Sequence, residues 1–164
     1  MSTTRRRWLG RHGLLAAGAA TFASLAGARA AAPRPASERM PGDPPEHRVI
    51  YQVNHADAEY LEHILGSVGA MIGRYEDNVA IALVAFGPGI HLLARQPRRP
   101  VSAALRERVR AQARDYGVEL IACGNTMKTL GWTAADLIEG VQVEEVGAAV
   151  LMERQERGWA YIAW

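Results

Sequence analysis

The chain has 164 residues, with 19 lysine and arginine residues against 17 aspartate and glutamate residues, and a formal net charge of +2. Its basic excess comes from the first thirty positions, which hold five arginines and no acidic residue. Subtracting these five leaves 14 basic against 17 acidic residues, a charge of −3 over residues 31–164. This balance predicts no clustered basic face on the folded part, so we expect no nucleic acid partner.

The remaining composition indicates one globular domain. Apolar residues make up 49% and charged residues 22% of the chain, which is typical of a folded protein rather than a disordered one. The chain contains one cysteine, Cys123, which excludes an internal disulfide framework.

Residues 1–30 have the features of an export signal. Arg5, Arg6 and Arg7 precede Trp8-Leu9, and a weakly apolar stretch rich in alanine and glycine follows them. Ala28-Arg29-Ala30 then offers a small-residue cleavage pattern before Ala31. The segment resembles a twin-arginine translocation signal, so we predict export to the periplasm and no stable membrane anchor after cleavage.

Residues 31–47 hold five of the eight prolines. Proline fixes its own backbone and lacks an N–H donor, so this stretch is predicted to be an extended linker. The folded domain is then expected to cover residues 48–164.

The first half of this domain alternates predicted strand and helix. Arg48–Val53 is a short β-rich run, and Asp57 can cap a helix whose apolar residues follow the 3.6-residue period up to Tyr75. Val79–Phe86 is continuously apolar, which indicates a strand covered on both faces in a parallel sheet. Gly87-Pro88-Gly89 is predicted to end it.

The second half continues the alternation. Ser102 can cap a helix running to Tyr116, which Gly117 would stop, and Val118–Ala122 is the third predicted strand. Thr133-x-x-Asp136 is a capping box for a short helix. The last predicted elements are a strand over Val141–Val146, a helix over Ala148–Arg157 and a strand over Trp159–Ala163.

This order predicts an α/β protein, a three-layer α/β/α sandwich on a mainly parallel five-stranded sheet of the Rossmann or flavodoxin type. Ligands of such sheets bind outside the carboxyl ends of the strands. The loops at these ends contain the candidate site residues, namely Asn54, His55, His91, Cys123, Gly124, Asn125, Thr126 and Met127.

Cys123 is the candidate nucleophile. It follows an apolar strand and precedes Gly124, where a tight turn can direct backbone N–H groups at an anion. Such a position lowers the pKa of a thiol, and the thiolate is the reactive form. The alternative is a cysteine that only packs in the core, as free cysteines often do.

His55 and His91 are expected on loops near Cys123, where either could support a thiolate or a bound anion. Asn125 and Thr126 are candidate ligand contacts, although turns favour both residue types. The two histidines and Cys123, together with Met127, also make up the ligand set of a blue-copper centre. No HxxxH or CxxC spacing strengthens that interpretation, so we predict no metal site.

Other sequence features leave alternatives open. Arg95, Arg98 and Arg99 could clamp an anion or a partner, or simply form a solvated loop. The aromatic residues Trp159, Tyr161 and Trp164 could seal a core edge or a subunit interface. There is no Walker A sequence and no GxSxG nucleophile elbow.

Five segments in order, YQVNHAD, LEHILGSV, VAFGPGIHLL, ACGNTMK and GWTAADL, resemble the DsrE/DsrF-like family. The resemblance implies a Rossmann-like three-layer fold and homo-oligomers, commonly trimers or hexamers. In sulfur-relay members a cysteine receives sulfane sulfur as a persulfide and passes it on, a role that would fall on Cys123. Sulfur donor and acceptor proteins or small thiols would be the partners, without a cofactor.

The leading hypothesis is therefore an exported sulfur carrier. Backbone amides around Gly124 and Asn125 would stabilise the thiolate or persulfide, and His55 and His91 would provide polar or proton-handling support. The alternatives are a non-catalytic oligomeric module that binds a small ligand or copper, and a purely structural oligomer.

Overall fold

The structure, a computed structural model, describes residue 40 and residues 42–164. The predicted signal peptide over residues 1–30 and most of the predicted linker over residues 31–47 lie outside the described residues. In the part that is described, no helix has both the length and the apolar character needed to cross a membrane.

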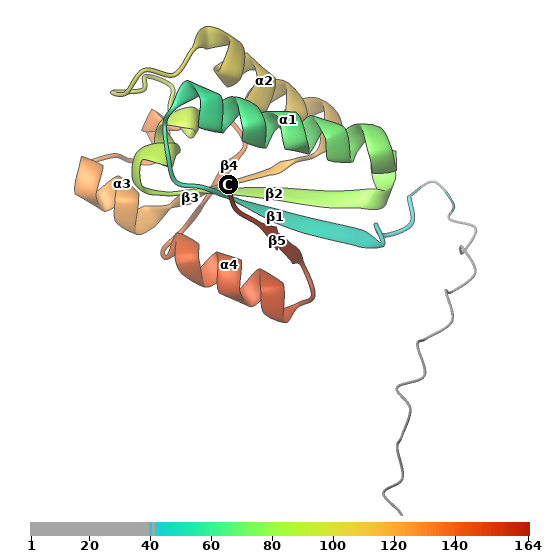
Figure 1. Ribbon diagram of the computed structural model, residues 1–164. Helices are drawn as coiled ribbons and strands as arrows, with labels where there is room; N and C mark the ends of the chain where they lie inside the picture. The colour runs from blue at the N-terminus through green and yellow to red at the C-terminus, as the bar shows by residue number, and fades with distance from the viewer. Residues whose placement is uncertain (1–39, 41) are drawn as a thin grey trace, which may run out of the picture. The chain divides into compact units, whose positions relative to one another are not determined.

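A five-stranded parallel sheet forms the middle layer, in the order β4-β3-β2-β1-β5 (Figure 1). The strands are β1 (His47–Val53), β2 (Val79–Ala85), β3 (Glu119–Cys123), β4 (Val141–Glu144) and β5 (Ala160–Ile162). The carboxyl-terminal parts of the central strands β1, β2 and β3 are mostly apolar and buried, as a parallel sheet covered on both faces requires.

Helices cover both faces of the sheet. The α-helices are α1 (Ala58–Tyr75), α2 (Ala103–Tyr116), α3 (Gly124–Leu130) and α4 (Gly147–Glu156). The described residues also include three 3₁₀ segments, η1 (Glu76–Asn78), η2 (Gly87–Leu93) and η3 (Ala134–Asp136). Figure 1 shows α1 and α2 above the sheet and α4 below it, which confirms the predicted three-layer α/β fold.

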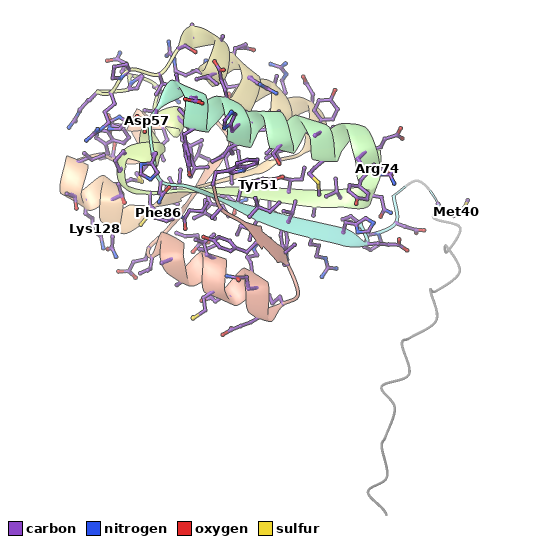
Figure 2. All side chains as sticks on the ribbon, viewed as in Figure 1. Met40, Tyr51, Asp57, Arg74, Phe86 and Lys128 are labelled. Atoms are coloured by element: carbon purple, nitrogen blue, oxygen red, sulfur yellow. The ribbon has the colours of Figure 1, made fainter. Side chains whose placement is uncertain are left out.

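The larger core lies between the sheet and the α1/α2 pair. The buried stripe of α1 consists of Leu61, Ile64, Leu65 and Val68, as its period predicts. Tyr51 points from β1 toward α1 (Figure 2), and its hydroxyl lies 2.9 Å from Ser67 Oγ. The buried Gln112 of α2 donates at 2.9 Å to the carbonyl of Leu65 and so ties the two helices together.

A smaller core lies on the α4 face of the sheet. It contains Ile50, Ala82, Val84, Ile121 and Leu151. Phe86 and Trp159 pack against it, and the guanidinium of Arg154 stands 4.3 Å from the centre of the Trp159 ring. Trp159 therefore closes the edge of this core, one of the two roles open to the C-terminal aromatics.

The helix starts follow the sequence with one difference. Ser102 caps α2 as predicted, because its Oγ accepts from the Leu105 N–H at 3.2 Å, and Gly117 ends the helix with φ 67°. Asp57 occupies the N-cap position of α1, but its side chain makes no cap hydrogen bond. The Thr133/Asp136 capping box is present on η3.

Two segments predicted as turns are helical. Gly87-Pro88-Gly89 opens η2, and Cys123-Gly124 opens α3 rather than a loop. Several strand and helix ends also move by one or two residues. β3 extends to Cys123, β4 stops at Glu144 instead of Val146, and α4 begins at Gly147.

Gly89 explains why η2 can form where it does. A Cβ on this residue would stand 2.1 Å from the carbonyl oxygen of Val53 and 2.8 Å from the backbone nitrogen of Asn54. Only glycine permits this approach of η2 to the end of β1. The close approach brings the loops after β1 and β2 together at the carboxyl edge of the sheet.

Candidate active site at the carboxyl ends of the strands

The chain leaves β3 and β4 toward opposite faces of the sheet. The connection after β3 places Met127 and Trp132 in the α1/α2 core, whereas the connection after β4 leads directly into α4 on the other face. This divergence is a topological switch point, the place where parallel α/β sheets bind ligands. Cys123 is the last residue of β3 and lies at this point.

The Cys123 side chain is nearly buried, with 7% of the residue exposed. Its Sγ accepts a hydrogen bond from the backbone N–H of Gly147 at 3.3 Å. Sγ also lies 3.9 Å from the carbonyl oxygen of Glu145, to which a protonated thiol can donate. The thiol is therefore held between the end of β3 and the first turn of α4.

Gly147 allows this contact because it has no side chain. A Cβ there would meet the Cβ of Cys123 at 3.0 Å, Val84 Cγ1 at 3.3 Å and Phe86 Cδ1 at 3.4 Å. Gly147 is also the first residue of α4, so its N–H has no partner within the helix. The positive end of the helix dipole thus faces the sulfur.

Two opposing effects act on the thiol, and together they lower the pKa of Cys123. Burial raises the pKa, because it disfavours the thiolate. Hydrogen bonds from the Gly147 backbone, from the backbone and hydroxyl of Thr126, and from the Asn125 backbone lower it and prevail. The Asn125 N–H also donates to the Glu145 carbonyl at 3.0 Å, so Gly147 and Thr126 are the principal donors.

The predicted site residues around Cys123 fall on α3. Gly124 is buried and is the first residue of this helix, with Asn125 exposed beside it. Thr126 lies half-buried one position further, and its Oγ1 accepts from the Gly87 N–H at 3.0 Å. Since that bond leaves the hydroxyl hydrogen free, Thr126 can donate to the thiolate while it holds the start of η2.

His91 lies on η2 and is buried, with 3% of the residue exposed. Its Nδ1 accepts from the Arg98 N–H at 3.2 Å, and its ring stands edge-on to Trp132 at 5.1 Å between centroids. Burial lowers its pKa, and the charges of Arg99 and Arg98 lower it further. His91 is therefore a neutral imidazole near pH 7.

Asn54 and His55 lie at the start of the connection to α1. Asn54 belongs to a local network, since its Oδ1 lies 2.9 Å from the hydroxyl of Tyr60 and its N–H donates to that hydroxyl at 3.2 Å. His55 is exposed, with Nδ1 4.0 Å from a carboxylate oxygen of Asp57. Both residues thus have partners within their own segment.

Neither His55 nor His91 forms a hydrogen bond with the Cys123 thiol in the described part of the chain. Nor does residue 40 or the range 42–164 contain a group of three histidine, cysteine or acidic side chains that could hold a metal ion. Met127, the fourth residue of the copper hypothesis, is buried in the α1/α2 core.

The residue that sequence reasoning missed is Gly147. It lies 24 positions after Cys123, between a predicted strand and a predicted helix, and no role was predicted for it. A glycine directly after a strand and before a helix is a signal for close backbone approach, which could have identified it.

Comparison with known proteins points to one family. The model of the DsrE/DsrF-like family matches residues 47–164. No curated protein matches the chain. The solved structure of MTH1491 from Methanobacterium thermoautotrophicum, a protein of unknown function, is 28% identical, with a TM-score of 0.63 over 73% of this chain and 100% of its own. The ychN protein from E. coli is 15% identical and shares the fold, with a TM-score of 0.59 over 72% of this chain and 99% of its own.

Proposed function

The chain belongs to the DsrE/DsrF-like family, which associates it with sulfur relay, and we propose that its Cys123 carries sulfane sulfur as a persulfide between a donor and an acceptor thiol. The observation that supports this proposal most is the Gly147 N–H 3.3 Å from Sγ at the start of α4. A backbone donor in that position favours the anionic form of the sulfur.

Loading would proceed by attack of the Cys123 thiolate on the sulfane sulfur of a donor such as thiosulfate. A new sulfur–sulfur bond forms at Sγ, the sulfur–sulfur bond of the donor breaks, and its electron pair leaves with sulfite. The product is a persulfide anion on Cys123. Attack of an acceptor thiolate on the outer sulfur returns Cys123 to the thiolate and leaves the persulfide on the acceptor.

In this proposal, the chain stabilises the anion with its backbone and one hydroxyl. Gly147 and Thr126 are the main donors to the sulfur, where the sequence hypothesis named the backbone amides around Gly124 and Asn125. His55 and His91 have other partners and are not assigned a part in the transfer.

The proposal extends to location and assembly. The twin-arginine segment before Trp8 supports export to the periplasm, where a single unpaired thiol such as Cys123 is exposed to oxidants. Family membership supports a homo-oligomer of three or six chains, acting with donor and acceptor proteins or small thiols.

A turnover assay tests the proposal. The full-length chain is incubated with thiosulfate and excess dithiothreitol, and the release of sulfide is followed over time. We expect release above the uncatalysed rate, falling to that rate in Cys123→Ser. Thr129→Val serves as the matched control on the same helix, because its hydroxyl donates to the Asn125 carbonyl rather than to the thiol. Release that is no faster than in the absence of protein would overturn the proposal.

A further inference from the structure

A pocket of about 280 Å³ opens at the carboxyl edge of the sheet, between η2 and α3. Its lining includes His91, Arg99, Thr126 and Thr129, and no acidic residue. A second pocket of about 330 Å³ adjoins it, because Pro88 and Arg99 line both. The first pocket is therefore a small cavity whose lining includes one cationic side chain and no carboxylate.

His91 presents a hydrogen-bond donor to this pocket. Its Nδ1 accepts from the backbone of Arg98, so the hydrogen of the neutral ring is on Nε2. In the described part of the chain, this Nε2 has no hydrogen-bond partner, although the residue is 97% buried, with 3% exposed. Nε2 is not among the completely buried side-chain atoms that lack a partner, so it can donate to a group bound in the pocket that His91 lines.

Arg99 supplies the positive charge. Its guanidinium is exposed and makes no ion pair or hydrogen bond with the described residues, yet its charge is close enough to lower the pKa of His91. The neighbouring arginines are engaged, because Arg95 donates to the Leu137 carbonyl at 2.7 Å and Arg98 to the Leu130 carbonyl at 2.9 Å.

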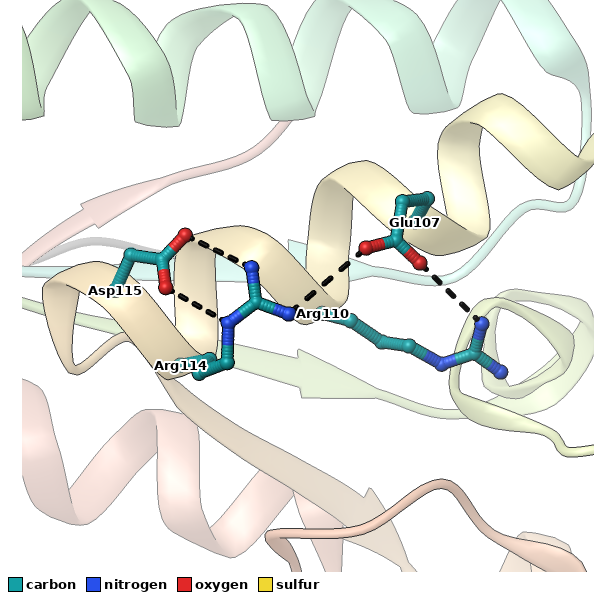
Figure 3. A network of polar contacts seen from close by, with 4 residues as sticks. All are labelled: Glu107, Arg110, Arg114 and Asp115. Carbon is teal, nitrogen blue, oxygen red and sulfur yellow. Dashed lines mark hydrogen bonds and ion pairs between the residues drawn. The ribbon is translucent and has the colours of Figure 1, made fainter.

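Two arginines of α2, Arg110 and Arg114, are engaged as well. Arg114 forms two hydrogen bonds with Asp115, at 2.8 and 3.0 Å, and lies 3.9 Å from Glu107. Arg110 lies 3.9 Å from the other oxygen of Glu107 (Figure 3). The guanidinium of Arg99 is thus the one at the pocket that an incoming anion can bind without displacing an existing partner.

We infer that this pocket binds a small tetrahedral oxyanion, held between the guanidinium of Arg99 and the Nε2–H of His91. A guanidinium matches the geometry of two oxyanion oxygens, and a neutral imidazole donates to a third without adding charge. Thr129 donates its hydroxyl to the Asn125 carbonyl, and Thr126 donates its hydroxyl to the Cys123 thiol, so the anion's donors in this pocket are Arg99 and His91. Free sulfur oxyanions and phosphate share this chemistry.

Binding of an anion in this pocket does not depend on sulfur transfer by Cys123, and the experiment tests binding separately from transfer. Thr126 lines the pocket and also contacts the Cys123 thiol, so the two sites are neighbours. The titrations therefore use full-length Cys123→Ser, which cannot react with thiosulfate. Saturable binding in this variant supports the pocket whatever the outcome of the turnover assay.

The experiment is isothermal titration with sodium thiosulfate, sulfate and phosphate in separate runs. We expect saturable millimolar binding of at least one anion, weakened about tenfold or more by Arg99→Gln, because a charge-assisted pair is lost. Preference for thiosulfate would assign the site to sulfur oxyanions, and preference for phosphate would assign it to phosphate. Arg110→Gln, which removes the same charge outside the pocket, is expected to bind as before.

A second variant guards against a folding defect. His91→Asn retains an acceptor near the position of Nδ1 for the Arg98 N–H and removes the Nε2 donor. We expect weaker binding in this variant with native circular dichroism. The inference is overturned if none of the three anions binds saturably, or if Arg99→Gln binds as well as Arg110→Gln.

Discussion

Gly147 determines what the Cys123 sulfur can contact, because its missing side chain lets a helix N-terminus approach the thiol. The N–H of Gly147 is 3.3 Å from Sγ, and the space for a Cβ is already filled by Cys123, Val84 and Phe86. Tight packing and stabilisation of the anion therefore depend on the same residue.

Gly147→Ala is expected to destabilise the protein by about 1–3 kcal/mol, because the added methyl overpacks the α4 face. Gly73→Ala on α1 is the matched control, since a Cβ there has nothing within 4 Å. Its expected effect is a gain of about 0.5–1 kcal/mol, because alanine favours the helix. Urea unfolding of both variants measures the free energy of unfolding of each. Equal changes in the two variants would contradict the tight packing around Gly147.

Thr126→Val should raise the pKa of Cys123, because it removes a hydrogen bond to the thiolate. The native pKa is lowered, so the thiolate forms at a lower pH in the folded protein than in the unfolded chain. The pH profile of alkylation by iodoacetamide measures this, and we expect severalfold slower reaction of Thr126→Val at pH 7. Thr129→Val should react like the wild type. An unchanged rate in Thr126→Val would contradict the hydrogen bond from the Thr126 hydroxyl to the thiolate.

The lowered pKa also gives the sign of a stability effect. Between the folded and unfolded pKa values the unfolded chain binds more protons, so this thiol contributes stability that grows as the pH rises through that window. The contribution is complete above the unfolded pKa and is lost as the pH falls through the folded pKa.

At the scale of single residues, the positions of Cys123 and Thr126 at the end of the third strand could be predicted from the sequence, but the arrangement around them could not. Cys123 was predictable because it ends a strand that is recognisable by its apolar run. The hydrogen-bond partners of the histidines were not predictable, because the pairing of His91 with Arg98 depends on the path of η2. Gly147 could not be paired with Cys123 from spacing alone, since 24 residues separate them.

At the scale of elements, the two helix caps differ in a way that mutation can resolve. Ser102→Ala removes the Oγ that accepts from Leu105 and should cost about 1 kcal/mol. Asp57→Ala removes a side chain that makes no cap hydrogen bond to α1, so its cost should be clearly smaller. Thermal unfolding of both variants provides the comparison, and an equal loss would contradict the capping geometry.

The elements that the sequence analysis missed are short and rich in glycine. η2 begins Gly-Pro-Gly and α3 begins with Gly124, and both patterns predict turns. Their helical form depends on tertiary contacts, among them the approach of Gly89 to Val53 and the bond from Gly87 to Thr126. The long strands and the helices α1 and α2 were predictable because their hydrophobic patterns are complete in themselves.

At the scale of the whole molecule, the order of elements was enough to predict the parallel sheet and its two helical layers. The strand order was not predictable, because it depends on α4 crossing from β4 at one edge to β5 at the other. Because of that crossing, the connections that follow β3 and β4 leave toward opposite faces of the sheet, so the switch point falls at Cys123. The thiol thus lies next to the edge of the sheet where folds of this kind bind ligands.

The proposed export can be tested on the whole chain. Replacing Arg5 and Arg6 by lysine is expected to abolish delivery to the periplasm in a bacterial host, because the twin arginine is the recognised feature. Arg11→Lys makes the same change outside the pair and should leave delivery intact. Fractionation of the cells followed by immunoblotting distinguishes these outcomes, and undiminished delivery of the double variant would contradict the prediction.

The intact mass of the protein after exposure to a sulfane sulfur donor tests the central claim most directly. Full-length wild-type chain treated with polysulfide should gain about 32 Da, the mass of one sulfur atom, which an acceptor thiol then removes. Cys123→Ser should gain nothing under the same conditions. A wild-type chain that keeps its original mass, or a Cys123→Ser chain that acquires the same adduct, would contradict the assignment of sulfur carriage to Cys123.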